Sequence, residues 1–248
     1  MRMNASHDWI APEWPAPARV RSLITTRYGG VSTGAHASFN LGLSAGDDAS
    51  AVRANRANLR THLPGEPAWL KQVHGARVVT AEAIAGIPEA DASVTRHPGT
   101  VCAVMIADCL PVLLCGRQGD VVAVAHAGWR GLSSGVVENT VAAIGGTAGD
   151  LLAYLGPAIG PTAFEVGADV RDAFLATDAG AAAAFKPHGE RKWRADLFWL
   201  ARRRLTRCGV TMIYGGGLCT YRDAARFYSY RRDGTTGRMA ALIWLDNT

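Results

Sequence analysis

Two short apolar runs in the middle of the chain, separated by a compact polar turn, constrain the fold more than any other segment. Residues 111–115 read Pro-Val-Leu-Leu-Cys and residues 121–125 read Val-Val-Ala-Val-Ala, with Gly-Arg-Gln-Gly-Asp between them at 116–120. Paired apolar runs around a glycine-containing turn are typical of a β-hairpin. If the turn centres on Gln118, Leu110 is expected opposite His126.

This pairing would bring a thiol and an imidazole together. Cys109 precedes Leu110 by one residue, a strand rise of roughly 3.3 Å. His74 comes from outside the hairpin, in a run that ends at Gly75, where glycine gives the backbone room to turn. Two imidazoles and one thiolate suit zinc, and three protein ligands leave the fourth tetrahedral position for water or substrate. The sequence therefore predicts a catalytic type of metal site at His74, Cys109 and His126.

Each of these residues also has an ordinary interpretation. A single cysteine beside apolar residues is commonly an inert small hydrophobe, and a single histidine near a strand end is commonly a hydrogen-bonded structural residue. The spacings from 74 to 109 and from 109 to 126 match no local zinc-finger, ribbon or deaminase signature. The hairpin pairing is what favours the metal site.

Length and composition favour one domain. The chain has 248 residues, 48% hydrophobic and 19% charged, without a break in composition, so we expect a single domain over 1–248 with an irregular segment at 1–18. The first residues lack the apolar core of a secretory signal, and no run approaches the roughly 18 apolar residues of a membrane span. A cytoplasmic location without membrane contact is predicted, with the five cysteines reduced.

The charge balance is modest, with 26 basic and 21 acidic residues and a net charge of +5. Basic residues cluster at 191–194, 202–207 and 231–232, and the middle cluster is typical of a solvated helix face. Nucleic-acid binding would require aromatic residues interleaved with basic ones, or a recognisable module. Neither is present, so no nucleic-acid partner is predicted.

Strand-like runs alternate with amphipathic stretches, which predicts a mixed α/β domain. Helices are expected from Asp48, a plausible N-cap, to just before Pro64, from about 133 to 145, and from 197 to about 207 with Gly209 at C′. Strands are expected at 22–27, 70–74, 101–107, 111–115, 121–126, 151–155, 212–214, 227–231 and 241–245.

Polar residues beside the predicted metal site could bind and use a substrate. A glycine-rich turn at 27–34 begins with Arg27 and suits either anion binding by backbone amides or a plain tight turn. Trp129 and Arg130 follow His126 and could supply a stacking face and a phosphate-binding fork. Asp108 could act as a base or orient a ligand imidazole, unless it points to the opposite face of the strand.

Seven ordered motifs carry a resemblance that spans about 22–245. They are Arg-Tyr-Gly-Gly-Val-Ser at 27–32, Ser-Phe-Asn-Leu-Gly-Leu at 38–43, Gln-Val-His-Gly at 72–75, Ala-Asp-Cys-Leu-Pro-Val-Leu at 107–113, His-Ala-Gly-Trp-Arg-Gly-Leu at 126–132, Leu-Gly-Pro-Ala-Ile-Gly at 155–160 and Tyr-Arg-Arg-Asp-Gly at 230–234. With these motifs the chain resembles the bacterial YfiH-type "laccase domain" family of purine nucleoside phosphorylases. His36 and Phe39 stand where the family more commonly has Tyr and Leu, which bears on pocket shape.

The resemblance implies a single α/β domain of layered mixed sheets flanked by helices, with zinc ligands at the same three residues. It also implies phosphorolysis of adenosine, inosine, guanosine and methylthioadenosine, and deamination of adenosine. Phosphate charge could then be held by zinc and by Arg27, Arg130 or Arg231, while Asn40 and Gln72 could bind sugar or base. Deamination needs a proton shuttle, for which Asp108 and Glu165 are candidates.

Three other functions remain open. Copper could replace zinc at the same ligands, as in a polyphenol oxidase, but a multicopper laccase needs more histidines than the seven present. One branch of the family is linked to editing peptidoglycan precursors, which would make the protein a metal-dependent amidase acting on a UDP-muropeptide. A non-catalytic zinc module would require a closed four-ligand site, for example one completed by Cys219.

Overall fold

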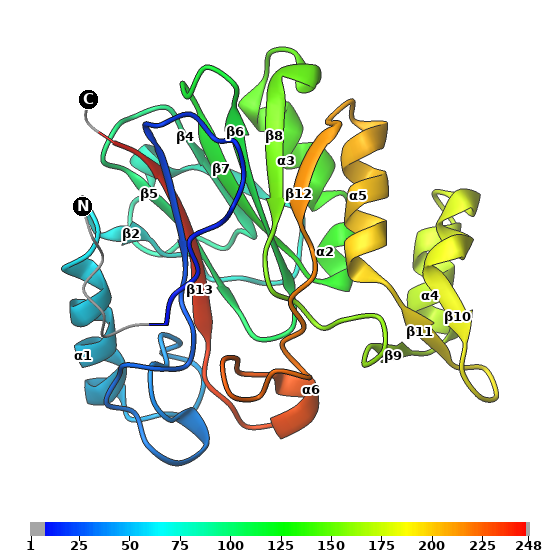
Figure 1. The fold of residues 1–248 in the computed structure, drawn as a ribbon, viewed down its shortest axis with the longest axis horizontal. Helices are drawn as coiled ribbons and strands as arrows, with labels where there is room; N and C mark the ends of the chain where they lie inside the picture. The colour runs from blue at the N-terminus through cyan, green and yellow to red at the C-terminus, as the bar shows by residue number, and fades with distance from the viewer. Residues whose placement is uncertain (1–7, 247–248) are drawn as a thin grey trace.

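A six-stranded sheet with apolar side chains on both faces forms the centre of the molecule (Figure 1). The computed structural model describes residues 8–246, in which this sheet has the order β12-β8-β6-β7-β4-β3, beside a four-stranded sheet β1-β13-β5-β2 and a three-stranded sheet β10-β11-β9. The strands are β1 (Val20–Ile24), β2 (Pro67–Ala68), β3 (Val78–Thr80), β4 (Ala92–Thr95), β5 (Val101–Ile106), β6 (Leu110–Gly116), β7 (Val122–Ala127), β8 (Leu151–Leu155), β9 (Glu165–Val166), β10 (Phe185–Pro187), β11 (Trp193–Ala195), β12 (Met212–Gly215) and β13 (Met239–Leu245).

The helices are α1 (Ala49–Arg60), α2 (Trp129–Ser133), α3 (Val136–Ile144), α4 (Ala168–Leu175), α5 (Leu197–Arg207) and α6 (Tyr230–Asp233). Helices α2, α3 and α5 lie on one side of the six-stranded sheet and α1 lies on the outer side of the four-stranded sheet, whereas α4 lies beside the three-stranded sheet and α6 near the start of β13 (Figure 1). Short 3-10 helices occur at Gly34–His36, Ala81–Ala83, Ala148–Asp150 and Ala179–Ala184. The predicted single domain of layered mixed sheets and helices is confirmed.

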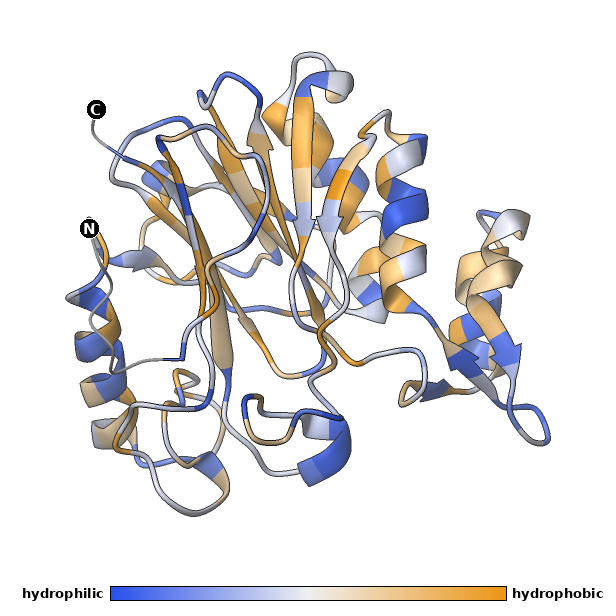
Figure 2. Cartoon of the chain, viewed as in Figure 1, coloured by the Kyte–Doolittle hydropathy of each residue, from blue (hydrophilic) through white to orange (hydrophobic). Residues whose placement is uncertain are grey.

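The alternation of side chains along β6 explains the layers. Leu110, Val112 and Leu114 pack on the helical side, whereas Leu113 and Cys115 pack between the two larger sheets. The outer face of the four-stranded sheet carries its own cluster, which includes Leu59 of α1. The central strands are accordingly hydrophobic almost throughout, and α6 is hydrophilic (Figure 2). Apolar packing on both faces of the six-stranded sheet thus fixes the positions of β6 and β7.

The predicted hairpin forms, but its register differs by one residue. Pro111, not Leu110, faces His126 in the β6–β7 pair. The turn is centred between Gln118 and Gly119 and not on Gln118. Gly119 adopts φ +68°, and its N–H donates to the carbonyl of Gly116 at 2.9 Å. Cys109 consequently lies just outside β6, in the turn after β5.

Helix α5 spans the predicted residues. Asp196 caps it by accepting a hydrogen bond from the N–H of Trp199 at 2.9 Å, and Gly209 adopts φ +91° after its last turn. The arginines on its outer face make contacts within the chain: Arg203 with Asp178, and Arg204 with Glu138 at 2.8 Å. Arginines of the basic cluster at 202–207 thus form ion pairs that hold α5 against its neighbours.

Three predicted elements are wrong or incomplete. Residues 70–74 form no strand, because the polar groups there bind side chains and backbone elsewhere, as described below. Residues 227–231 are irregular until Ser229 caps α6 by accepting the N–H of Arg232 at 3.2 Å. The helix predicted from about 133 to 145 is α3, which begins only at Val136 because Gly135 before it adopts φ +92°, and the preceding α2 was not predicted.

The N-terminal segment is irregular where the structure describes it. Residues 8–19 contain no helix, and their one bridge pairs Ile10 with Ile24. The first seven residues of the predicted segment lie outside the described residues. No helix in 8–246 combines the length and apolarity needed to cross a membrane.

Candidate metal centre

Three segments from different parts of the fold bring His74, Cys109 and His126 together. His126 lies near the end of β7, Cys109 immediately precedes β6, and His74 lies in the irregular segment between β2 and β3. Their ligand atoms lie within 4.8 Å of one another, and the two imidazole centroids are 4.9 Å apart. Within residues 8–246 this is the one group of three or more histidine, cysteine or acidic residues close enough to hold a metal ion.

The burial of the three residues is graded. His126 is buried, Cys109 is partly buried and His74 is exposed. A metal held by all three would therefore keep a side that faces solvent, as a site that binds water or substrate must. Cys219, the candidate for a closing fourth ligand, is not part of the group, and its Sγ instead accepts the N–H of Gly160 at 3.2 Å.

A buried carboxylate that the sequence did not suggest orients both histidines. Asp91 lies just before β4 and is fully buried. Its Oδ1 accepts a hydrogen bond from the N–H of His74 at 2.9 Å and lies 2.9 Å from Nδ1 of His126. Its Oδ2 accepts from the N–H groups of Val73 and Gly75, at 3.2 and 2.7 Å. Asp91 thus holds the segment that presents His74, although His74 adopts φ +60°.

The contact with Asp91 also fixes the tautomer of His126. A carboxylate accepts only, so Nδ1 of His126 carries a proton, and Nε2 is the nitrogen that would release its proton to bind a metal. Burial would by itself raise the pKa of Asp91, but the hydrogen bonds from His126 and from Gly75 outweigh burial and lower it. The carboxylate stays ionised, which is the state that orients a ligand imidazole.

Cys109 and His126 form a charge-coupled pair. Burial alone would raise the pKa of the Cys109 thiol, but attraction and hydrogen bonding to His126 and His74 lower it to about 6. Burial would lower the pKa of His126, yet the thiolate and Asp91 raise it to about 9. A thiolate at neutral pH beside two imidazoles is a donor set that fits a transition metal. The cysteines buried within strands differ, since burial raises the pKa of both Cys102 and Cys115 to about 12.

Glycine at position 128 makes room for the ligands. A Cβ placed there would lie 2.7 Å from Sγ of Cys109 and 3.4 Å from Cδ2 of His74. Its backbone, with φ −62° and ψ 163°, is open to any residue. Only the space beside the thiolate therefore requires glycine.

Gly128→Ala is expected to weaken metal binding at this group by about tenfold or more, because the new methyl group must displace Cys109 or His74. A zinc titration against a chromophoric chelator measures this. Gly149→Ala is the matched control, since a Cβ there meets no atom within 4 Å. Equal zinc affinity in the Gly128 and Gly149 variants would contradict the proposed ligand geometry.

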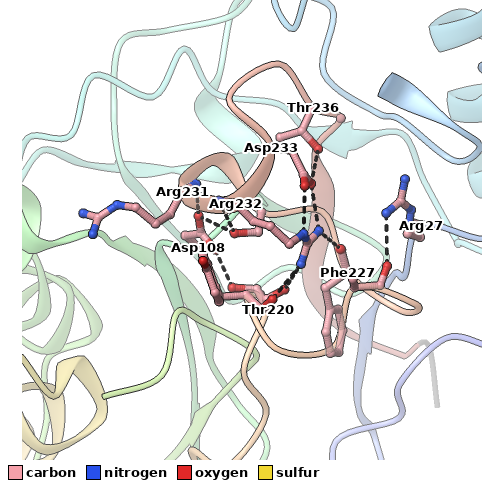
Figure 3. Close-up of polar contacts among 12 residues, drawn as sticks. Arg27, Asp108, Thr220, Phe227, Arg231, Arg232, Asp233 and Thr236 are labelled. Atoms are coloured by element: carbon pink, nitrogen blue, oxygen red, sulfur yellow. Dashed lines mark hydrogen bonds and ion pairs between the residues drawn. The ribbon is translucent and has the colours of Figure 1, made fainter. Parts of the chain in front are cut away.

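Asp108 orients the chain rather than an imidazole. Its carboxylate accepts hydrogen bonds from Oγ1 of Thr220 at 2.6 Å, Oγ of Ser229 at 3.0 Å and the N–H of Arg231 at 2.7 Å (Figure 3). The carboxylate that meets the ligand imidazole is Asp91. Asp108, with φ +90°, ties the turn that carries Cys109 to the segment around α6. Its contacts give no support to the predicted roles as a base or as the orienting group of a ligand imidazole.

Two residues predicted to bind sugar or base form hydrogen bonds within the protein. The Gln72 side chain pairs with the backbone of Met105, donating to its carbonyl at 2.8 Å and accepting its N–H at 2.7 Å. Asn40 is fully buried, and its amide contacts Asp47, Gly42 and the N–H of Arg238. These hydrogen bonds give both side chains a structural role, and their binding of sugar or base stays a prediction.

The three arginines predicted to hold phosphate differ in how many hydrogen bonds their guanidinium groups form within the protein. Arg27 donates from Nε and Nη1 to the carbonyls of Ala37 and Ala224, both at 3.0 Å. Arg231 donates from Nη1 to the carbonyl of Glu165 at 2.7 Å. Arg130 is exposed and lies over the Trp129 ring at 4.4 Å. Glu165, the other candidate proton shuttle, pairs with Lys192 at 3.2 Å, and this contact lowers its pKa.

The fold and this group define the class of the protein: a layered α/β domain with one candidate metal site, His74, Cys109 and His126, near the ends of its central strands. Comparison with known proteins identifies the family. The chain belongs to the family whose model is described as multi-copper polyphenol oxidoreductase laccase, which matches residues 21–246. This confirms the resemblance seen in the sequence motifs. The described residues offer one candidate metal site, whereas a multicopper oxidase needs several.

Relatives that match over nearly their whole length are named purine nucleoside phosphorylases and not laccases. The chain is 53% identical over 246 residues to a purine nucleoside phosphorylase of Pseudomonas aeruginosa, covering 99% of this chain and 100% of the relative. It is 54% identical over 240 residues to purine nucleoside phosphorylase YfiH of Escherichia coli, covering 95% and 98%.

Solved structures show the same fold. The Neisseria meningitidis protein NMB0706 matches with a TM-score of 0.94 at 54% identity, covering 97% of this chain and all of that one. YlmD from Geobacillus stearothermophilus matches with a TM-score of 0.86 at 30% identity, covering 99% and 98%. The layered arrangement described above is therefore the family's arrangement.

Proposed function

We propose that the protein is a zinc-dependent purine nucleoside phosphorylase that cleaves adenosine, inosine, guanosine and methylthioadenosine, and that it also deaminates adenosine. The observation that carries the proposal is the solvent-facing His-Cys-His group in a chain 53% identical, over nearly its full length, to a relative named purine nucleoside phosphorylase. Two imidazole nitrogens and one thiolate favour zinc among the divalent transition metals, and copper is the competing ion.

The proposed reaction exchanges one bond for another. An oxygen of inorganic phosphate attacks C1′ of the ribose, the bond from C1′ to the purine nitrogen breaks, and the base leaves with the bonding electrons and is protonated. Bound zinc would supply Lewis-acid charge and activate water for deamination. His74, Cys109 and His126 would hold the ion, while Asp91 would orient the His126 imidazole and hold the backbone that presents His74. Arg130 and Arg231, which are exposed, would attract the phosphate.

Release of hypoxanthine from inosine by the purified zinc-loaded protein tests the proposal. Release that depends on phosphate, with one ribose 1-phosphate formed per base, is expected. Base release at the same rate without phosphate would mean hydrolysis and would contradict phosphorolysis. Absence of any nucleoside turnover in zinc-loaded protein would reject the function and direct the search to the UDP-muropeptide amide as substrate.

A further inference from the structure

Arg238 lies beside the metal centre but was not among the arginines predicted from the sequence motifs. It immediately precedes β13, whose first residue, Met239, pairs with Ile106 at the end of β5. Continuing this antiparallel register places Arg238 opposite Ala107, two residues before Cys109. Sheet pairing thus brings a guanidinium-bearing residue to the turn that carries the thiolate.

The backbone and the side-chain stem of Arg238 are fixed by neighbouring residues. Its N–H donates to Oδ1 of Asn40 at 2.8 Å, and its carbonyl accepts the N–H of Leu41 at 3.0 Å. Gly42 leaves space for the stem, because a Cβ there would lie 2.7 Å from Cγ of Arg238. The buried Asn40 amide therefore positions Arg238 before any ligand arrives, which lowers the entropic cost of binding.

One edge of the Arg238 guanidinium forms hydrogen bonds within the protein, and the other edge forms none to the described residues. Nη1 donates to the carbonyls of Thr236 and Gly237 at 2.8 and 3.0 Å, and the Tyr230 ring lies 5.9 Å from Cζ. Among residues 8–246 no acceptor meets Nε or Nη2, and no carboxylate forms an ion pair with Arg238. Nε and Nη2 make the parallel fork that an arginine uses to bind two oxygens of one anion.

Arg238 is partly buried and has no carboxylate ion-pair partner among the described residues. Burial lowers the pKa of Arg238, and the negative charges of Cys109 and Asp108 oppose this effect without forming an ion pair with it. Two other partly buried arginines have carboxylate partners, Arg204 with Glu138 and Arg232 with Asp233, both at 2.8 Å, whereas Arg202 donates to the carbonyls of Ile213 and Gly215. A cation that is partly desolvated and unpaired gains more from an arriving anion than an exposed one does.

We propose that Arg238 binds the phosphate co-substrate through Nε and Nη2 and holds it beside the metal centre. This inference rests on the proposed phosphorolysis. Arg27 has both an Nε and an Nη1 bond to carbonyls, and Arg130 and Arg231 are exposed, so none of them combines a fixed stem with a free fork. Arg238 stabilises the attacking oxyanion in place and transfers no proton.

Arg238→Gln tests the inference, with Arg238→Lys keeping the charge and losing the fork. Arg53→Gln is the matched control, because Arg53 is exposed on α1. Three quantities are compared: the KM for phosphate at saturating inosine, the KM for inosine at saturating phosphate, and the binding of inorganic phosphate to zinc-loaded protein by ³¹P NMR without nucleoside. Zinc content and the melting temperature are measured on the same samples.

Arg238→Gln is expected to raise the KM for phosphate by about tenfold or more and to weaken ³¹P-detected binding in parallel, with the KM for inosine changing less than about twofold. Arg238→Lys is expected to fall between, and Arg53→Gln to match the parent. An unchanged phosphate KM and unchanged phosphate binding would overturn the inference. So would an equal rise of both KM values, which would indicate a structural role.

The two proposals fail in different ways. If the parent protein turns over no nucleoside, the proposed function is rejected, while the comparison of phosphate binding between the parent and Arg238→Gln still decides the role of Arg238. If the parent shows phosphorolysis but Arg238→Gln keeps its phosphate KM, the function stands and the assignment of Arg238 falls.

Discussion

Replacing Cys109 with alanine is expected to abolish zinc binding and nucleoside turnover together while leaving the chain folded. Cys109 provides the thiolate of a three-ligand group, and two imidazoles alone bind zinc poorly. The loss of affinity should exceed the roughly 10- to 100-fold typical for removal of a residue that only orients a ligand. Because the buried His126 loses the thiolate that pairs with it, the free energy of unfolding of metal-free protein should fall by about 1 to 3 kcal/mol.

Metal content of the purified variant and its rate with inosine measure the effect. Cys208→Ala is the matched control: Cys208 is also a partly buried cysteine, but it lies at the C-terminal cap of α5. Zinc content and turnover should be unchanged there. Nucleoside cleavage retained by metal-free Cys109→Ala protein would contradict the zinc mechanism.

Asp91→Asn is expected to weaken both the fold and the metal site. The carboxylate accepts the N–H groups of residues 73–75 and faces Nδ1 of His126. An asparagine has one acceptor oxygen, so its NH₂ group must face at least one of these donors. Leaving buried donors unsatisfied costs about 1 to 3 kcal/mol each, and loss of a ligand-orienting carboxylate typically weakens metal binding 10- to 100-fold.

Asp47→Asn separates the two effects of Asp91→Asn. Asp47 is another buried carboxylate, bound by Oγ of Ser32 at 2.6 Å and Nδ2 of Asn40 at 2.9 Å, and it contacts no proposed metal ligand. Its replacement should lower the free energy of unfolding with zinc affinity unchanged. Chemical denaturation of metal-free protein and zinc titration of folded protein are measured for both variants. If Asp91→Asn lowers stability but leaves zinc affinity at the level of Asp47→Asn, Asp91 does not orient the ligands.

Local sequence patterns predicted the elements whose contacts lie close in the chain. The apolar runs around Gly119 were sufficient for the β6–β7 hairpin, and this hairpin brought Cys109 and His126 together despite a one-residue error in register. The apolar spacing, Asp196 and Gly209 were sufficient for α5. In these segments the nearest neighbours in sequence are also the packing and hydrogen-bonding partners.

The sequence was uninformative where long-range contacts decide the structure. Residues 70–74 look like a strand, but Gln72 pairs with Met105 and the following amides bind Asp91. Asp91 itself lies between two alanines before a short strand, with no local sign that its partners are 17 and 35 residues away. Arg238 likewise acquires its setting from Asn40, which only the folded sheet brings near.

A zinc titration of chelator-treated protein, with phosphate-dependent inosine cleavage followed at each step, tests the central claim most directly. If His74, Cys109 and His126 hold one ion required for phosphorolysis, activity should rise in proportion to bound zinc and level off at one ion per chain. Full phosphate-dependent activity before any zinc is added would contradict the account.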